Sequence, residues 1–303
     1  MDFSAELNDI IRDDRPVSAA RLTFLSDIGA DERATLTLMW PAVGTERRRK
    51  IAATLVQVAE DNIEYDFYTV FRVLLGDPDP AVRRLAVEGL VEDESSNTLL
   101  RLIEVLEGDP DPGVRAAAAN ALGPSALRAE TGSLRGDTPD RLRAALLDAA
   151  RRPGGDEEVG RRALESVAYY CDNPEVEQEI ERAYAGSGLL RASALHAMGR
   201  NMSRRWMPIL LKELTNPQAV MRFEAAQALG ELGERKNVPA LVPLLEDDDS
   251  EVQFAAIWAL GQLGGSVASQ SLELLRADAD EAVQEAVDEA LTEIRYGSDP
   301  LGV

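Results

Sequence analysis

Residues 111–123 read DPGVRAAAANALG, and the chain repeats this pattern along its length. Similar stretches occupy residues 79–90 (DPAVRRLAVEGL), 219–230 (AVMRFEAAQALG) and 251–261 (EVQFAAIWALG), and a degenerate copy spans residues 281–292. When further, more diverged copies are included, the residue equivalent to Arg115 falls at Arg49, Arg83, Arg115, Arg161, Arg191, Arg222, Gln253 and Gln284. Successive copies then lie 30 to 34 residues apart, with one wider interval of 46 residues. Self-similarity at this period predicts an array of repeats in which each unit packs on its neighbours.

Each unit is predicted to contain two helices. In the quoted copy, Asp111 is the expected N-cap of the second helix and Pro112 its first residue. Gly123 is expected to end that helix, as Gly230 and Gly261 do in later copies. The first helices are shorter and rich in leucine, and we expect them over residues 98–107, 207–214, 238–245 and 268–276.

Alanine recurs at one position of the second helices. The distance between two packed helices depends on the side chains at their contact, so these alanines mark where adjacent units approach closely. The alanines at this position are Ala86, Ala118, Ala194, Ala225 and Ala256.

The repeat resembles HEAT repeats, in particular the short HEAT-like repeat of the phycobilisome-lyase type, over about residues 46–295. The resemblance implies an all-α fold, an α-α superhelix (a HEAT-repeat solenoid) of about eight helical hairpins. We expect one solenoid over residues 1–303, with capping helices at 1–45, a loop insertion at about 124–138 and a frayed tail at 296–303. The insertion accounts for the wide interval between copies.

The resemblance also implies a polar ladder built on an Asp that stands six residues before an Arg. The chain has this spacing at Asp77/Arg83 and Asp109/Arg115, and Asn216/Arg222 is a variant. In the last two units Gln replaces the Arg, at Asp247/Gln253 and Asp278/Gln284. Any ladder in those units is therefore uncharged on one side.

The charge balance excludes several classes of partner. The 303 residues include 54 acidic and 32 basic ones, a formal net charge of −22. Proteins that bind the phosphates of nucleic acids, or anionic membranes, normally show the opposite balance. With one cysteine, no apolar run long enough to span a bilayer and no visible signal peptide, a cytoplasmic protein is expected. A monomer is favoured, because the acidic last helix is typical of a solubilising cap.

One position in the second helices is mostly polar while its neighbours are apolar, so we expect it to face the concave groove of the solenoid. At this position and one turn before it, two units carry Phe223, Phe254 and Trp258. Aromatic clusters of this kind are typical of binding hot spots. Two interpretations stay open: a recognition patch, or packing between neighbouring second helices. His196 and Gln227 occupy the same position in the preceding units and are expected to add polar contacts.

Charge is concentrated near the end of the chain. Residues 246–303 contain fourteen acidic residues against Arg276 and Arg295. A basic surface on a partner is expected to be steered towards this end. The ordinary alternative is that these side chains are solvated faces and helix caps.

Enzymatic motifs are missing from the sequence. It has no glycine-rich phosphate loop, no Gly-x-Ser-x-Gly motif and a single histidine, His196, which has no His or Cys neighbour for a zinc site. Neither a catalytic residue nor a cofactor or metal ligand is therefore predicted. The histidine pairs of deoxyhypusine hydroxylase and the basic groove of HEAT-like DNA glycosylases are also lacking.

These observations predict a non-enzymatic scaffold that binds a peptide or helix of a partner protein in its concave groove. The expected contact residues are Phe223, Phe254, Trp258, His196 and Gln227. The alternative, implied by the resemblance, is a bilin-lyase-like or chaperone subunit that acts on a tetrapyrrole chromophore.

Overall fold

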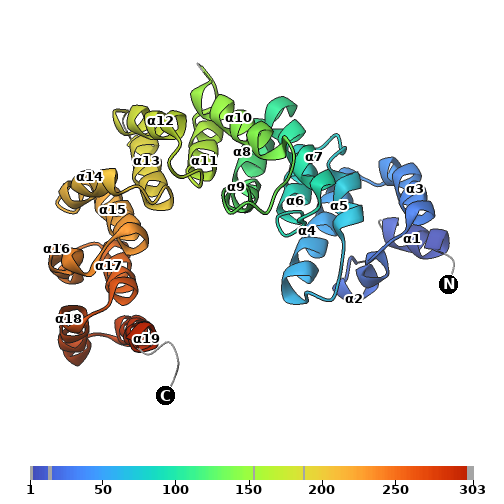
Figure 1. Ribbon diagram of the computed structural model, residues 1–303. Coiled ribbons are helices and arrows are strands. Elements are labelled where there is room, and N and C mark those ends of the chain that lie inside the picture. The colour runs from blue at the N-terminus through green and yellow to red at the C-terminus, as the bar shows by residue number, and fades with distance from the viewer. Residues whose placement is uncertain (1–2, 13–15, 153, 187, 299–303) are drawn as a thin grey trace. The chain divides into compact units, whose positions relative to one another are not determined.

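The computed structural model describes residues 3–12, 16–152, 154–186 and 188–298, and over these residues every regular element is helical. The all-α prediction is therefore confirmed (Figure 1). The chain divides into two compact units, residues Met1–Ser166 and Val167–Val303. Helices α1 to α10 lie in the first unit and α12 to α19 in the second, while α11 ends at the boundary.

Hairpins stack within the first unit. Helix α5 packs against α6 and α7 against α8, and the second helices form a row in which α6 lies between α4 and α8. The helices of this unit are α1 (Phe3–Ile11), α2 (Ala19–Leu22), α3 (Ala30–Met39), α4 (Thr45–Asp61), α5 (Tyr68–Leu74), α6 (Pro80–Glu88), α7 (Ser96–Gly108), α8 (Pro112–Ala121), α9 (Gly123–Glu130), α10 (Thr138–Arg151) and α11 (Glu157–Val167).

The second unit has the same plan. Helices α12, α14 and α18 pack against α13, α15 and α19, and the short α16 with the following 3-10 turn packs against α17. The second helices again form a row in the order α13, α15, α17, α19. The helices are α12 (Pro174–Tyr184), α13 (Gly188–Arg200), α14 (Met207–Glu213), α15 (Ala219–Leu232), α16 (Val238–Leu241), α17 (Ser250–Leu263), α18 (Ser266–Asp278) and α19 (Glu281–Ser298).

The predicted helix starts are confirmed. The Asp79 carboxylate accepts hydrogen bonds from the backbone N–H groups of Ala81 and Val82, and Asp111 accepts one from Val114. Proline follows each of these N-caps as the first helical residue. The five recurrent alanines are fully buried, so they belong to the core.

The prediction that glycine ends the second helices holds at Gly123 and is wrong at Gly230 and Gly261. Helix α8 ends at Ala121, just before Gly123, which opens α9. Gly230 and Gly261 lie inside α15 and α17, which continue to buried leucines. These two glycines instead allow a close approach to the next second helix. A β-carbon added to Gly261 would lie 3.0 Å from the Cα of Ala290 in α19.

The loop insertion expected at about 124–138 is partly helical, which corrects that prediction. Residues 123–130 form α9, because Pro124 suits the first turn and the residues after it favour a helix. Ala126 anchors this helix as a fully buried side chain. The expected tail at 296–303 is also helical up to Ser298, and residues 299–303 lie outside the described residues.

The polar ladder connects neighbouring repeats. Arg83 donates from Nε and Nη2 to the Asp109 carboxylate of the next repeat, both at 2.8 Å. It also donates from Nη1 to the backbone carbonyl of Asp77 in its own repeat. Arg222 likewise donates to Asp247 at 2.6 and 2.7 Å. The six-residue spacing thus pairs each Arg with a backbone carbonyl of its own repeat. The carboxylate partners of Arg83 and Arg222 belong to the next repeat.

The glutamines of the last repeats also donate to backbone carbonyls of their own repeat. Gln253 donates to the carbonyl of Leu245 and Gln284 to that of Ala279. The side chain of Asp278, which occupies in the repeat after Gln253 the position that Asp247 occupies after Arg222, lies outside the described residues.

Candidate functional site

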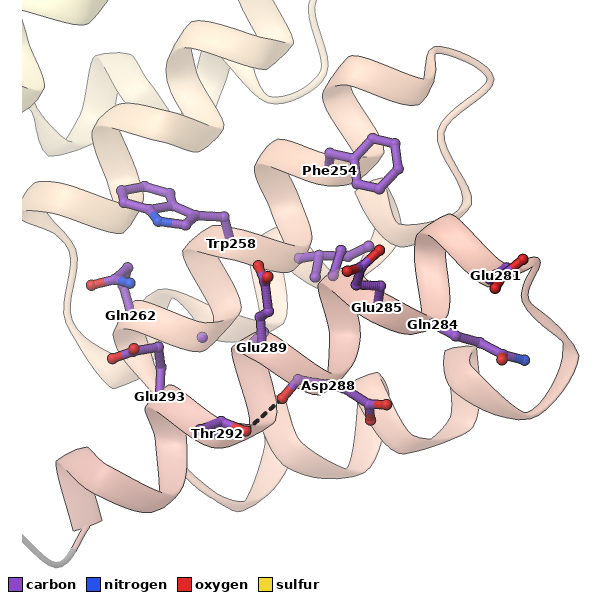
Figure 2. A pocket seen from close by; sticks show the side chains of 14 residues that line it. Phe254, Trp258, Gln262, Glu281, Gln284, Glu285, Asp288, Glu289, Thr292 and Glu293 are labelled. Carbon is purple, nitrogen blue, oxygen red and sulfur yellow. Dashed lines mark hydrogen bonds between the residues drawn. The ribbon is translucent and has the colours of Figure 1, made fainter. Parts of the chain in front are cut away.

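A cleft of about 920 Å³ separates the exposed faces of α17 and α19. Helix α17 contributes one wall, which contains Phe254, Trp258 and Gln262. Helix α19 contributes the other wall, which is strongly acidic. Its charged residues in the cleft are Glu281, Glu285, Asp288, Glu289 and Glu293, and none of the described lining residues is basic. Figure 2 shows the aromatic and acidic side chains on the two facing helices.

Trp258 is held in place by a glycine on the neighbouring helix α15. A β-carbon added to Gly230 would lie 2.3 Å from Cζ3 of the indole, so the ring rests directly on that backbone. The side chain nevertheless keeps 36% of its surface exposed, and Phe254, one turn earlier on α17, is half-buried. The pair therefore presents an apolar surface with a fixed orientation.

Four glutamates form a stripe along α19. Glu281, Glu285, Glu289 and Glu293 stand four residues apart and are all exposed, and none of them makes an ion pair with a described residue. Figure 2 shows Glu285 and Glu289 directed towards α17. Asp288 differs, because the Arg276 guanidinium of α18 lies 2.8 Å from its carboxylate. The uncompensated charge of the cleft is therefore concentrated on the stripe.

Phe223, the third aromatic residue of the predicted site, lies outside this cleft. It is half-buried on α15 and lines a separate, shallow cavity of about 270 Å³ with Val220, Asp249 and Glu251. The structure thus places Phe254 and Trp258 in one cleft and Phe223 in another.

His196 and Gln227 also lie away from the cleft, on α13 and α15. His196 is half-buried, with Nδ1 3.3 Å from the Glu224 carboxylate, and Gln227 is half-buried. Loss of hydration raises the pKa of the nearby Glu231, while the charges of His196 and Arg200 act in the opposite direction. The contact of His196 with Glu224 joins α13 to α15, and neither His196 nor Gln227 lines the cleft between α17 and α19.

The sequence analysis did not single out the glutamate stripe as part of the site. Glu289 occupies the position expected to face the groove and Glu285 stands one turn before it, yet neither is among the expected contact residues. Their four-residue spacing was visible in the sequence and indicates one helical face. Which helix that face opposes could only be seen once α17 and α19 were placed side by side.

The described part of the chain contains neither a metal-binding cluster nor a membrane-spanning helix. No three His, Cys, Asp or Glu side chains there come together as a metal site. None of the described helices combines the length and apolar character needed to cross a bilayer.

Comparison with known proteins identifies a repeat family. The family model for HEAT repeats matches residues 69–151 and 207–292, more than half of the chain. No curated protein matches the sequence. The predicted α-α superhelix is thereby confirmed as the fold class, while the phycobilisome-lyase type stays a prediction.

Solved structures of low sequence identity align with this chain. Importin beta aligns with 96% of this chain at 13% identity and a TM-score of 0.50, and this chain spans 46% of its length. The Escherichia coli protein YibA aligns over 80% of this chain and 95% of its own, at 19% identity and a TM-score of 0.46. Human deoxyhypusine hydroxylase aligns over 97% of both chains at 16% identity and a TM-score of 0.36.

Proposed function

The chain belongs to the HEAT-repeat family, and from this premise we propose that it is a non-enzymatic scaffold that binds a positively charged segment of a partner protein. The binding site is the cleft between α17 and α19. HEAT-repeat folds serve as interaction scaffolds for many unrelated partners, so the fold supports a protein ligand without naming it. A cytoplasmic location and a monomeric state belong to the same proposal.

The composition of the cleft carries this proposal. An exposed tryptophan and a half-buried phenylalanine on one wall supply the apolar contact that dominates binding free energy at protein interfaces. The opposite wall supplies negative charge, and apart from Asp288 its carboxylates make no ion pair with a described basic side chain. A ligand that combines apolar and cationic groups would match both walls.

The glutamate stripe makes an anionic ligand unfavourable. Like charges four residues apart destabilise a helix by about 0.2–0.5 kcal/mol per pair, and carboxylates near a helix C-terminus also oppose its dipole. Glu293 stands in the last turns of α19 and experiences both effects. A cationic partner would relieve this repulsion, and its approach would be steered by the net charge of −22.

The tetrapyrrole alternative has weaker support from the cleft. Bilins carry propionate groups, which would face the carboxylates of Glu285, Glu289 and Glu293 across the same space. The aromatic wall alone favours a flat chromophore, and the acidic wall opposes it. Visible absorbance that the purified protein retains after incubation with a bilin would support this alternative.

Selection from a random displayed peptide library tests the proposal without assuming a sequence. The wild-type chain should enrich peptides that carry positive charge together with apolar residues. These peptides should not bind the Phe254→Ala/Trp258→Ala variant, but should bind Tyr296→Ala, which removes an exposed aromatic residue outside the cleft. Enrichment of neutral or acidic peptides, or equal binding to the double variant, would overturn the proposal.

A further inference from the structure

The two walls of the cleft repeat with the same spacing. On α17, Phe254 and Trp258 stand four residues apart, and on α19 so do Glu285 and Glu289. Four residues of an α-helix rise about 6 Å, so both rows repeat at that distance. The helices themselves are in close contact, because the Cα of Ala290 lies 3.0 Å from the β-carbon position of Gly261. A ligand along the cleft therefore meets an aromatic side chain and a carboxylate at regular steps.

The surroundings of Trp258 favour a planar cation. Its ring is held against Gly230 and leaves part of its surface exposed, and the Glu289 carboxylate of α19 is directed towards α17, the helix that carries the ring (Figure 2). A guanidinium can stack on an indole and at the same time donate two parallel hydrogen bonds to a carboxylate. A lysine ammonium is a compact, strongly hydrated charge that cannot make both contacts with the same geometry.

The cleft offers the same kinds of group one helical turn away. Phe254 on α17 and Glu285 on α19 line it there, each about 6 Å along its helix from Trp258 or Glu289. A helix presents side chains four residues apart at this same interval of about 6 Å. An extended peptide presents alternate side chains about 6.6–6.8 Å apart, so the helical interval is the closer match.

We propose that the cleft recognises arginine in preference to lysine, on a partner helix that carries arginines four residues apart. The inference rests on the proposed function, since it specifies the ligand of the same cleft. Trp258 and Glu289 hold one arginine, and Phe254 and Glu285 the next. Charge complementarity selects the cation, and the fixed indole selects the guanidinium.

Calorimetric titration of the full chain with synthetic alanine-based peptides of equal length and charge tests the inference. One peptide carries three arginines four residues apart, the second carries lysines at those positions, and the third carries the arginines on different faces of the helix. We expect the first to bind about fivefold more tightly than the second and more tightly than the third. The Trp258→Leu variant should lose the preference for arginine, whereas Tyr296→Ala should keep it.

The outcomes separate this inference from the proposed function. If the lysine or the rearranged peptide binds as tightly as the first, or if Trp258→Leu retains the preference while remaining folded, the arginine inference is wrong and the scaffold proposal stands. Trp258→Phe, which keeps a ring, should retain part of the preference and guards against a general loss of structure. If none of the three basic peptides binds, both the inference and the proposed function are contradicted.

Discussion

The indole of Trp258 on α17 lies directly against Gly230 on α15, at a point where a β-carbon would come within 2.3 Å of Cζ3 and 2.8 Å of Cε3. The absence of a side chain at residue 230 therefore decides where the ring can lie. Because the same ring forms one wall of the cleft between α17 and α19, the packing of two neighbouring repeats sets the geometry of the candidate binding surface.

Replacing Gly230 with alanine should displace the ring. We expect a net loss of about 1–3 kcal/mol in the free energy of unfolding, because the steric overlap exceeds the gain in helix propensity. Acrylamide quenching of tryptophan fluorescence should increase, since Trp40 and Trp206 are buried and report little. Gly108→Ala is the matched control, because a β-carbon there has no heavy atom within 4 Å. Equal behaviour of the two variants would show that Gly230 does not hold the ring.

The Arg222–Asp247 pair predicts a pH-dependent part of the stability. Hydrogen bonds from Arg222 hold the pKa of Asp247 below its ordinary value of 3.8. As pH falls, the unfolded chain takes up this proton first, so the contribution is complete above about pH 5 and is lost as pH falls towards the lower folded-state pKa.

The Asp247→Asn variant should therefore lose about 2 kcal/mol of unfolding free energy at neutral pH, and the difference from wild type should shrink below about pH 4. Urea denaturation across this pH range measures both effects. Asp248→Asn removes the same charge from an exposed neighbour and should change stability by less than about 0.5 kcal/mol. If the two variants lose the same amount at neutral pH, the pair does not contribute as described.

Neutralising the stripe should change stability and affinity in opposite directions. The Glu285→Gln/Glu289→Gln variant relieves all three like-charge pairs along α19, so we expect about 1 kcal/mol more unfolding free energy. The same variant should bind basic peptides more weakly, and its affinity should depend less on salt. Asp248→Asn/Glu273→Gln makes the same charge change outside the cleft and should keep most of the affinity. A loss of both stability and affinity would indicate a structural role for the glutamates instead.

The fold followed from local signals that are independent of tertiary structure. Asp79 and Asp111 mark helix starts because a short carboxylate before proline caps the first turn wherever the helix lies. Ala225 and Ala256 mark the core because equivalent positions of successive repeats are buried alike.

Contacts between repeats were harder to predict. A glycine near a predicted helix end looks the same in the sequence whether it ends the helix or lets a neighbouring helix pack closely against it. Gly230 lies inside α15 and allows α17 to pack closely. The Arg83 spacing pointed to Asp77, yet its carboxylate partner is Asp109, because units stack with an offset that the local spacing does not contain.

The candidate site was only partly visible for the same reason. Phe254 and Trp258 belong to one helix, so their four-residue spacing placed them together. Grouping Phe223 with them assumed that one column of the repeat forms one surface, whereas the structure gives it a separate cavity. The acidic wall lies on the next helix, and its part in the cleft depends on how α19 packs against α17.

The most direct test of the central claim is the dissociation constant of a display-selected basic peptide for wild type and for Phe254→Ala/Trp258→Ala. The proposal predicts that the double variant keeps its helical circular dichroism and loses at least about 2 kcal/mol of binding free energy. Tyr296→Ala should bind as wild type does, because this exposed residue lies outside the cleft. Unchanged affinity in the folded double variant would contradict the assignment of this cleft as the binding site.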